Sequence, residues 1–267
     1  MEYRTHDVRT PLIFDVKRTS TTDGPGIRTV FFLKGCNLDC FWCHNPEGKH
    51  PEREIAFFSE KCTHCGTCAA VCPARRTDGT CTHCATCVEY CPAEARRVYG
   101  REYRPEELLE IARSDLEYFR ATGGGVTFSG GECMLYPAFV AEVARLCRAE
   151  GISTAIDTAG AVPYSHFETV LPYTDVFLYD VKCLDSDLHR KGTGVGNERI
   201  LENLERLREA GKQIVIRTPV IPGFNDGEEL ERVKAYCRER SLPHELLPYH
   251  AMGESKKTAL AAFPRKK

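Results

Sequence analysis

The distribution of apolar residues along the chain predicts alternating strands and helices. Short runs rich in β-branched and aromatic residues are separated by segments with an apolar residue every three or four positions. The clearest helical segments are YPAFVAEVARLCRAEG and NERILENLERLREAGK. The six predicted strands are IRTVFFL, VTFS, ISTAID, DVFLYD, KQIVIRTPV and HELLPY, at residues 27–33, 126–129, 152–157, 175–180, 212–220 and 244–249.

This alternation is typical of an α/β fold. Parallel strands joined by right-handed helical crossovers bring their carboxyl ends to one edge, where ligands bind. The chain also contains a cysteine-rich insert of about forty residues. The remaining roughly 225 residues are fewer than the ~250 residues typical of a closed eight-stranded barrel. We therefore expect six parallel strands in an open, partial (βα)6 barrel.

The composition is that of a soluble globular protein, with 42% hydrophobic and 28% charged residues. A formal net charge of -2 provides no broad cationic field, so neither nucleic acid nor a membrane surface is an expected partner. The N-terminal stretch MEYRTHDVRTPLIFDVKR interrupts its apolar residues with charges, unlike a signal peptide or a spanning helix. We expect a cytoplasmic protein.

The chain contains 15 cysteines, most of them in one region. Because the cytoplasm keeps thiols reduced, metal or redox chemistry explains so many cysteines better than disulfides do. Eleven lie between residues 36 and 91, and Cys133, Cys147, Cys183 and Cys237 are scattered. Cys147 and Cys237 fall in helical patterns, where a free thiol behaves as a small apolar side chain.

Two copies of the pattern CxxCxxCxxxCP occupy the dense region. Three closely spaced thiolates hold three corners of an iron-sulfur cube, and the fourth normally binds the other cluster. The pattern therefore predicts a two-cluster ferredoxin-like module rather than a zinc ribbon, whose CxxC pairs are more widely separated. The expected ligand sets are Cys62, Cys65 and Cys68 with Cys91, and Cys81, Cys84 and Cys87 with Cys72.

A third group, Cys36, Cys40 and Cys43 in CNLDCFWCHNPEG, has the different spacing CxxxCxxC and no fourth cysteine of the right kind nearby. A cube held by three thiolates leaves one iron open to an outside ligand, which indicates chemistry rather than scaffolding. The alternative is haem attachment through CxxCH. That attachment occurs outside the cytosol, and we see no export signal.

These motifs resemble those of the radical S-adenosylmethionine (SAM) enzymes. Residues 19–48, TSTTDGPGIRTVFFLKGCNLDCFWCHNPEG, are similar to the N-terminal signature of the glycyl-radical enzyme activating enzymes, and the resemblance covers nearly the whole chain. The inserted ferredoxin motifs resemble the larger members of that group. We expect residues 1–58 and 100–267 to form the radical SAM barrel, and residues 59–99 to form the ferredoxin-like 2x[4Fe-4S] insert.

The resemblance implies a cofactor site at the strand ends. The GGE motif, Gly130, Gly131 and Glu132, would grip the methionyl amine of SAM, although family members usually have proline in place of Cys133. Asp157 and Thr158 resemble the DTxG motif, and Asp180 and Lys182 the DxK pair. With backbone carbonyls near Thr158 and Leu178, the two aspartates would hold a monovalent cation. The simpler alternatives are an ordinary βα turn, a helix cap and a surface ion pair.

Further positions follow from the same resemblance. Arg217 and His250 match family positions near the cofactor, and with Lys182 they form the expected catalytic group. Without the resemblance, His250 would be interpreted as a structural histidine. The DGPG loop resembles the element that meets the partner's glycyl loop, whereas an exposed turn is the alternative. Its residues are Asp23, Gly24, Pro25 and Gly26.

The implied activity is reductive cleavage of SAM at the open cluster, with three [4Fe-4S] clusters in all. The resulting 5′-deoxyadenosyl radical would take hydrogen from a glycine of a partner glycyl-radical enzyme, with electrons supplied by flavodoxin or ferredoxin. The insert would relay these electrons or shape the docking face. Two alternatives are another radical SAM enzyme, such as a peptide maturase, and a ferredoxin-like electron carrier, which needs neither the CxxxCxxC triplet nor the GGE motif.

Overall fold

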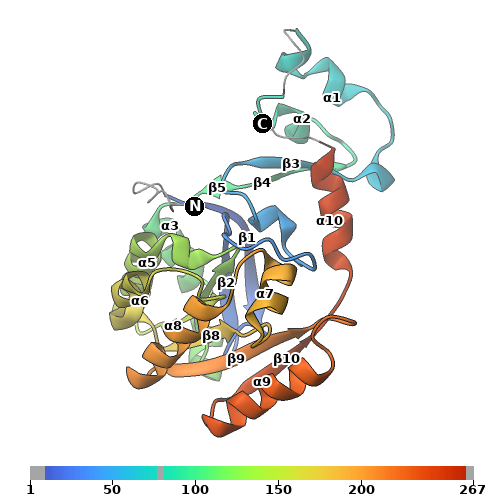
Figure 1. Ribbon diagram of the computed structural model, residues 1–267. Helices are drawn as coiled ribbons and strands as arrows, with labels where there is room; N and C mark the ends of the chain where they lie inside the picture. The colour runs from blue at the N-terminus through green and yellow to red at the C-terminus, as the bar shows by residue number, and fades with distance from the viewer. Residues whose placement is uncertain (1–9, 77–80, 263–267) are drawn as a thin grey trace.

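The computed structural model describes residues 10–76 and 81–262 and contains an eight-stranded sheet (Figure 1). Six neighbouring strands run parallel, and they coincide with the six runs predicted from the apolar pattern. The predicted α/β fold with a mostly parallel sheet is therefore confirmed. In spatial order these strands are β2 (Arg28–Leu33), β6 (Gly125–Gly130), β7 (Ser153–Thr158), β8 (Val176–Asp180), β9 (Gln213–Val220) and β10 (His244–Pro248).

Two antiparallel strands that the apolar pattern did not predict extend the sheet. β1 (Leu12–Ser20) pairs with β2, and β5 (Arg101–Glu102) pairs with β1. The two edges of the sheet are β10 and β5. Among the described strands, no pairing joins these two edges, so the sheet is open.

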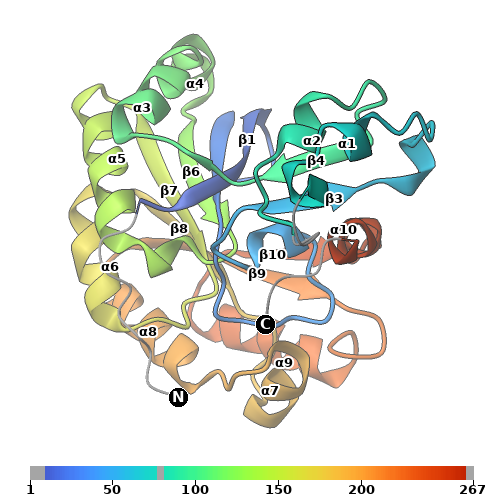
Figure 2. The same ribbon diagram turned by 90° about the horizontal axis from the view of Figure 1, so that it is seen from above.

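Helices cover the outer side of the parallel strands, and Figure 2 shows α5, α6 and α8 along this side. The helices pack through apolar stripes. On α5, for example, Val140, Val143, Ala144 and Cys147 recur at helical spacing and are fully buried. The helices after the cysteine-rich segment are α3 (Pro105–Arg113), α4 (Leu116–Thr122), α5 (Pro137–Ala149), α6 (Tyr164–Val170), α7 (Ser186–Thr193), α8 (Glu198–Glu209) and α9 (Glu228–Glu239). A last helix, α10 (Met252–Ala261), lies elsewhere, beside residues 54–57.

Cys147 and Cys237 lie in the core that α5 and α9 share with the sheet, as the sequence predicted. Over the described ranges, every helix is too short or too polar to cross a bilayer.

The cysteine-rich segment stands apart from the main sheet and begins and ends in a two-stranded antiparallel ladder (Figure 1). This ladder consists of β3 (Glu54–Phe57) and β4 (Arg96–Tyr99). Between its strands lie two single-turn helices that contact each other, α1 (Thr67–Ala70) and α2 (Thr86–Glu89). Short 3-10 turns are η1 (Pro46–Gly48), η2 (Ser59–Lys61), η3 (Pro73–Arg76), η4 (Cys133–Leu135) and η5 (Leu171–Tyr173).

Helix α10 connects this ladder to the loop that follows β2. Ala259 packs in a small second core with Phe14, Ala56 and Tyr99. On the loop side, Lys256 Nζ donates to the carbonyl oxygen of His44 at 3.3 Å and to Glu47 Oε1 at 2.6 Å. The close approach of helix and loop favours glycine at position 253, because a Cβ there would lie 2.2 Å from the Cys43 carbonyl oxygen.

Candidate functional site

The three cysteines of the CxxxCxxC motif lie in the loop that leaves the carboxyl end of β2. Backbone hydrogen bonds fix this loop: Cys36 N donates to Lys49 O at 2.9 Å, and Phe41 N donates to Gly192 O at 3.1 Å. Burial raises the pKa of Cys36 to about 12 and that of Cys40 to about 11. The free thiols therefore keep their protons at neutral pH, and a bound metal centre is what would deprotonate them.

A cavity of about 200 Å³ lies beside this loop, at the carboxyl ends of the parallel strands. Strands β6, β7, β8 and β9 each contribute side chains or backbone to its wall, because parallel strands end at the same edge of a sheet. The cavity brings together ten of the residues predicted from the sequence, namely Cys36, Cys40, Cys43, Gly130, Gly131, Asp157, Thr158, Asp180, Lys182 and Arg217.

Two carboxylates and two cations face this cavity. Lys182 Nζ donates to Asp180 Oδ2 at 2.5 Å, and Ser129 Oγ donates to Asp157 Oδ2 at 2.7 Å. Burial opposes the charge on Lys182, but the negative charge of Asp180 and its hydrogen bond contribute to raising the pKa of this lysine. The Asp180–Lys182 pair is largely buried, with side-chain exposures of 23% and 8%, so the surface ion-pair alternative is wrong.

Arg217 is buried and has donors without a hydrogen-bond partner. Its residue exposure is 8%, and neither Nε nor Nη1 makes a hydrogen bond with any described residue. Nη1 lies 3.4 Å from Asp157 Oδ1, and this carboxylate raises the pKa of Arg217. Because unsatisfied buried donors are costly, the guanidinium group fits a site that receives an anionic or polar ligand.

Glu132 does not line the cavity, although its neighbours Gly130 and Gly131 do. Its buried carboxylate accepts hydrogen bonds from Thr158 Oγ1 at 2.7 Å and from the backbone nitrogens of Met134 at 3.0 Å and Ala159 at 2.9 Å. Burial raises the pKa of Glu132 to about 7 despite these donors. The carboxylate thus joins the turn after β6 to the turn after β7.

His250 follows β10 and is exposed, and it does not line the cavity. Its ring stacks on that of His44, with centroids 3.9 Å apart and an interplanar angle of 19°. His44 directly follows Cys43 and does line the cavity. His250 therefore meets the cavity wall through a second histidine that sequence reasoning did not select.

None of residues 23–26 lines this cavity, because the DGPG loop precedes β2 and Cys36 follows it. Asp23 is only 9% exposed, and its carboxylate pairs with Lys17 Nζ at 3.1 Å, so the description as an exposed turn fails for this residue. The fully buried Arg28 fixes the loop by donating to Pro25 O at 3.1 Å and to Thr127 Oγ1 at 2.7 Å.

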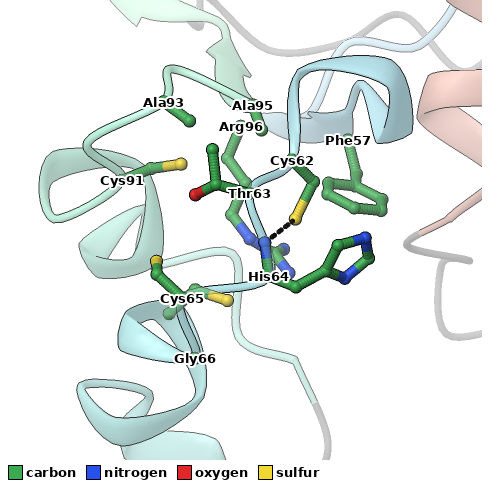
Figure 3. A pocket seen from close by; sticks show the side chains of 11 residues that line it. Phe57, Cys62, Thr63, His64, Cys65, Gly66, Cys91, Ala93, Ala95 and Arg96 are labelled. Atoms are coloured by element: carbon green, nitrogen blue, oxygen red, sulfur yellow. Dashed lines mark hydrogen bonds between the residues drawn. The ribbon is translucent and has the colours of Figure 1, made fainter.

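The cysteine-rich segment contains a second cavity, of about 270 Å³ (Figure 3). Four cysteines line it: Cys62, Cys65 and Cys68 from the first repeat, and Cys91 from the second. These are the same four residues that the CxxCxxCxxxCP pattern predicts as one ligand set.

The other four cysteines of the segment interact electrostatically at Cys87. Burial raises the pKa of Cys87, the charge of Arg96 opposes this rise, and Cys81, Cys72 and Cys84 add to it.

The two repeats have matching backbones. His64 and His83 have φ values of 56° and 54°, and each donates its backbone N–H to the preceding repeat cysteine at 3.4 Å. Gly66 and Ala85 both have positive φ, 79° and 66°, immediately before α1 and α2. Alanine accepts this conformation at some cost, which indicates that the surrounding turn imposes it.

Several cavity residues were not selected from the sequence. Trp42, Asn45 and Lys49 come from the cysteine loop itself, whereas Ser129 and Leu247 come from strand ends. For the first three, their place within or next to the CxxxCxxC motif was an available signal. The contribution of Leu247 depends on how β10 is placed beside β9, which the local sequence does not encode.

Known proteins resemble this chain over most of its length. A model of the radical SAM superfamily matches residues 30–236. The isethionate sulfite-lyase activating enzyme of Oleidesulfovibrio alaskensis is 40% identical and aligns with 94% of this chain and 87% of its own. The trans-4-hydroxy-L-proline dehydratase activating enzyme of Clostridioides difficile is 41% identical, with 92% and 86% covered. The benzylsuccinate synthase activating enzyme of Thauera aromatica is also 41% identical, with 95% and 82% covered.

Solved structures share the fold at lower identity. Streptococcus suis SuiB bound to the precursor peptide SuiA aligns with 84% of this chain and 39% of its own, with a TM-score of 0.54 and 16% identity. Native anSMEcpe with bound AdoMet aligns with 81% and 49%, with a TM-score of 0.51 and 16% identity. By its family match and its near-full-length relatives, this chain belongs to the radical SAM superfamily and, within it, to the glycyl-radical enzyme activating enzymes.

Proposed function

We propose that Cys36, Cys40 and Cys43 hold a [4Fe-4S] cluster that binds and reductively cleaves SAM, and that the product radical activates a partner glycyl-radical enzyme. The observation that carries this proposal is the single cavity that these cysteines share with Asp157, Asp180, Lys182 and Arg217. Three partly buried thiols beside two carboxylates and two cations suit a cluster with one open iron and a zwitterionic, sulfonium-bearing ligand.

The donor set fits a cluster better than a single ion. In a cube each thiolate binds a different iron, so the ligands need not converge on one ion. The motif spacings, CxxxCxxC in the triplet and CxxCxxCxxxCP in the insert, favour iron-sulfur clusters over zinc.

The residues of the cavity have separable tasks in this proposal. Arg217, whose Nε and Nη1 make no hydrogen bond with a described residue, binds the carboxylate of SAM. Gly130 and Gly131 present their backbone to the methionyl amine, while Glu132 holds the Thr158 turn in place. Asp157 and Asp180 bind a monovalent cation, and Lys182 balances their charge. Once bound, the cluster and SAM supply a 5′-deoxyadenosyl radical able to take hydrogen from a glycine.

The cysteine-rich segment, residues 59–99, carries two further [4Fe-4S] clusters in this proposal. The support is the pairing of repeats: Cys91 shares a cavity with Cys62, Cys65 and Cys68. These clusters receive electrons from flavodoxin or ferredoxin in the cytoplasm. The DGPG loop, residues 23–26, meets the glycyl loop of the partner. The partner is one of the enzyme classes that its relatives activate, such as isethionate sulfite-lyase or trans-4-hydroxy-L-proline dehydratase.

The test compares Cys36→Ala with Cys65→Ala under anaerobic conditions. With a strong chemical reductant, Cys36→Ala should abolish SAM cleavage, whereas Cys65→Ala should retain it and lose rate mainly with the protein reductant. Equal loss from both variants would contradict this assignment. Incubating the wild type with candidate partners should produce a glycine-centred electron paramagnetic resonance signal with one of them, and no signal with any would contradict the proposed partner class.

A further inference from the structure

One arginine of the insert lies between the two sets of cysteines. Arg96 is the first residue of β4, five positions after Cys91. It lines the cavity formed by Cys62, Cys65, Cys68 and Cys91, and Figure 3 shows its side chain among these lining residues.

The second set of cysteines also lies close to Arg96. Helix α2 (Thr86–Glu89), which carries Cys87, contacts β4, and Arg96 is the first residue of that strand. Cys87 belongs to the set with Cys72, Cys81 and Cys84. A single guanidinium group is thus near both sets.

The strand geometry fixes this position. Side chains alternate along a strand, so Arg96 and Arg97 point to opposite faces of β4. Arg96 is half-buried and pairs across the ladder with Phe57, and its guanidinium carbon lies 5.0 Å from the centre of that ring. Arg97 is exposed, lies 5.3 Å from the Tyr99 ring and does not line the cysteine cavity.

We propose that Arg96 tunes the reduction potentials of both clusters in the insert. Adding an electron to a cluster makes it more negative, and a nearby fixed cation stabilises that reduced form. Arg96 therefore raises both potentials and makes the insert easier to reduce. The inference rests on the two-cluster insert of the proposed function and adds a residue that ligates no iron.

The test is an anaerobic redox titration of the full-length, reconstituted protein, followed by electron paramagnetic resonance of the reduced clusters. Signals that do not change on addition of SAM report the insert. Arg96→Gln and Arg96→Met remove the charge, Arg96→Lys keeps it, and Arg97→Gln is the matched control. We expect the two charge-removing variants to weaken reduction of the insert clusters by about tenfold, equivalent to 59 mV for one electron.

The expected pattern is a lower potential in Arg96→Gln and Arg96→Met, with Arg96→Lys and Arg97→Gln close to the wild type. Equal potentials in all variants would overturn the inference, as would an equal shift in Arg97→Gln. If both charge-removing variants failed to bind iron in the insert while Arg97→Gln bound it, Arg96 would be a folding residue and the inference would be wrong. A wild-type protein without insert signals would instead refute the two-cluster proposal itself.

Discussion

Replacing Glu132 by Gln should alter how stability depends on pH. The folded protein holds the proton of this carboxyl with a pKa of about 7, against 4.5 as the ordinary value. Since the folded state binds this proton more tightly, the stabilisation that this carboxyl contributes is greatest below pH 4.5 and is lost as the pH rises through about 7. At about 1.4 kcal/mol per pH unit, the total effect is roughly 3 kcal/mol, and about half of it falls between pH 5.5 and pH 7.

The glutamine variant removes this titration but adds a constant loss. In the wild type, Met134 N, Ala159 N and Thr158 Oγ1 donate hydrogen bonds to the Glu132 carboxylate. In the variant, the amide NH2 replaces one acceptor oxygen, so donors face donors. Unsatisfied buried donors cost about 1–3 kcal/mol each. The variant should therefore have a lower Tm than the wild type at low pH. At about 2–4 °C per kcal/mol, the difference in Tm should shrink by about 3–6 °C between pH 5.5 and pH 7.

The assay is anaerobic thermal unfolding followed by circular dichroism across this pH range. Glu142→Gln is the control, because Glu142 lies on the exposed side of α5 and pairs with Arg145 at 2.8 Å. The difference in Tm between Glu142→Gln and the wild type should not shrink as the pH rises. A difference for Glu132→Gln that stays constant from pH 5.5 to pH 7 would refute the view that this carboxyl is held protonated by burial.

Three further substitutions probe the architecture around the site. Lys34→Met removes the cation that pairs with the buried Glu54 carboxylate at 2.8 Å. Because breaking a buried ion pair costs about 3–5 kcal/mol, the Tm should fall by about 10 °C. A fall in Tm of less than about 2 °C would contradict this expectation. Gly131→Ala places a Cβ 2.2 Å from the Gly35 carbonyl oxygen and should displace the cysteine loop. The iron content of the reconstituted protein should then fall by about four irons per chain. Full iron content would show that the loop adapts to the added methyl group. Arg217→Lys keeps the charge but loses the planar fork, so equilibrium dialysis should show SAM binding weakened by at least about tenfold, and an unchanged Kd would argue against a direct contact.

The parallel strands were predictable because their residues are buried on both faces. In β8, four consecutive residues, Val176 to Tyr179, are almost fully buried, which gives a continuous apolar run. β1 was not predicted because its buried and exposed residues alternate irregularly and its pairing with β2 contains register shifts. β3 and β4 have only four residues each, and β4 begins with two arginines, so neither forms a recognisable apolar run.

The residue types of the site were predictable from motifs, but the direction of individual side chains was not. The GGE motif correctly located the strand end, yet the structure turns the Glu132 carboxylate toward Thr158 and away from the cavity. Two of its three donors, Thr158 Oγ1 and Ala159 N, come from the end of the next strand and the turn after it, so only the packed sheet reveals them. Likewise, the stack of His250 on His44 joins residues from opposite ends of the chain that have no local relation in sequence.

The placement of α10 sets an order of events during biosynthesis. Lys256 binds the carbonyl of His44 across 212 positions of sequence, so the cysteine loop has left the ribosome long before residues 252–261 are translated. Until then, the backbone beside Cys43 lacks its helical neighbour and remains open to water. Helix α10 also packs on β3 of the ladder, so a nascent chain arrested before residue 252 should lack the final packing of both the cysteine loop and the ladder.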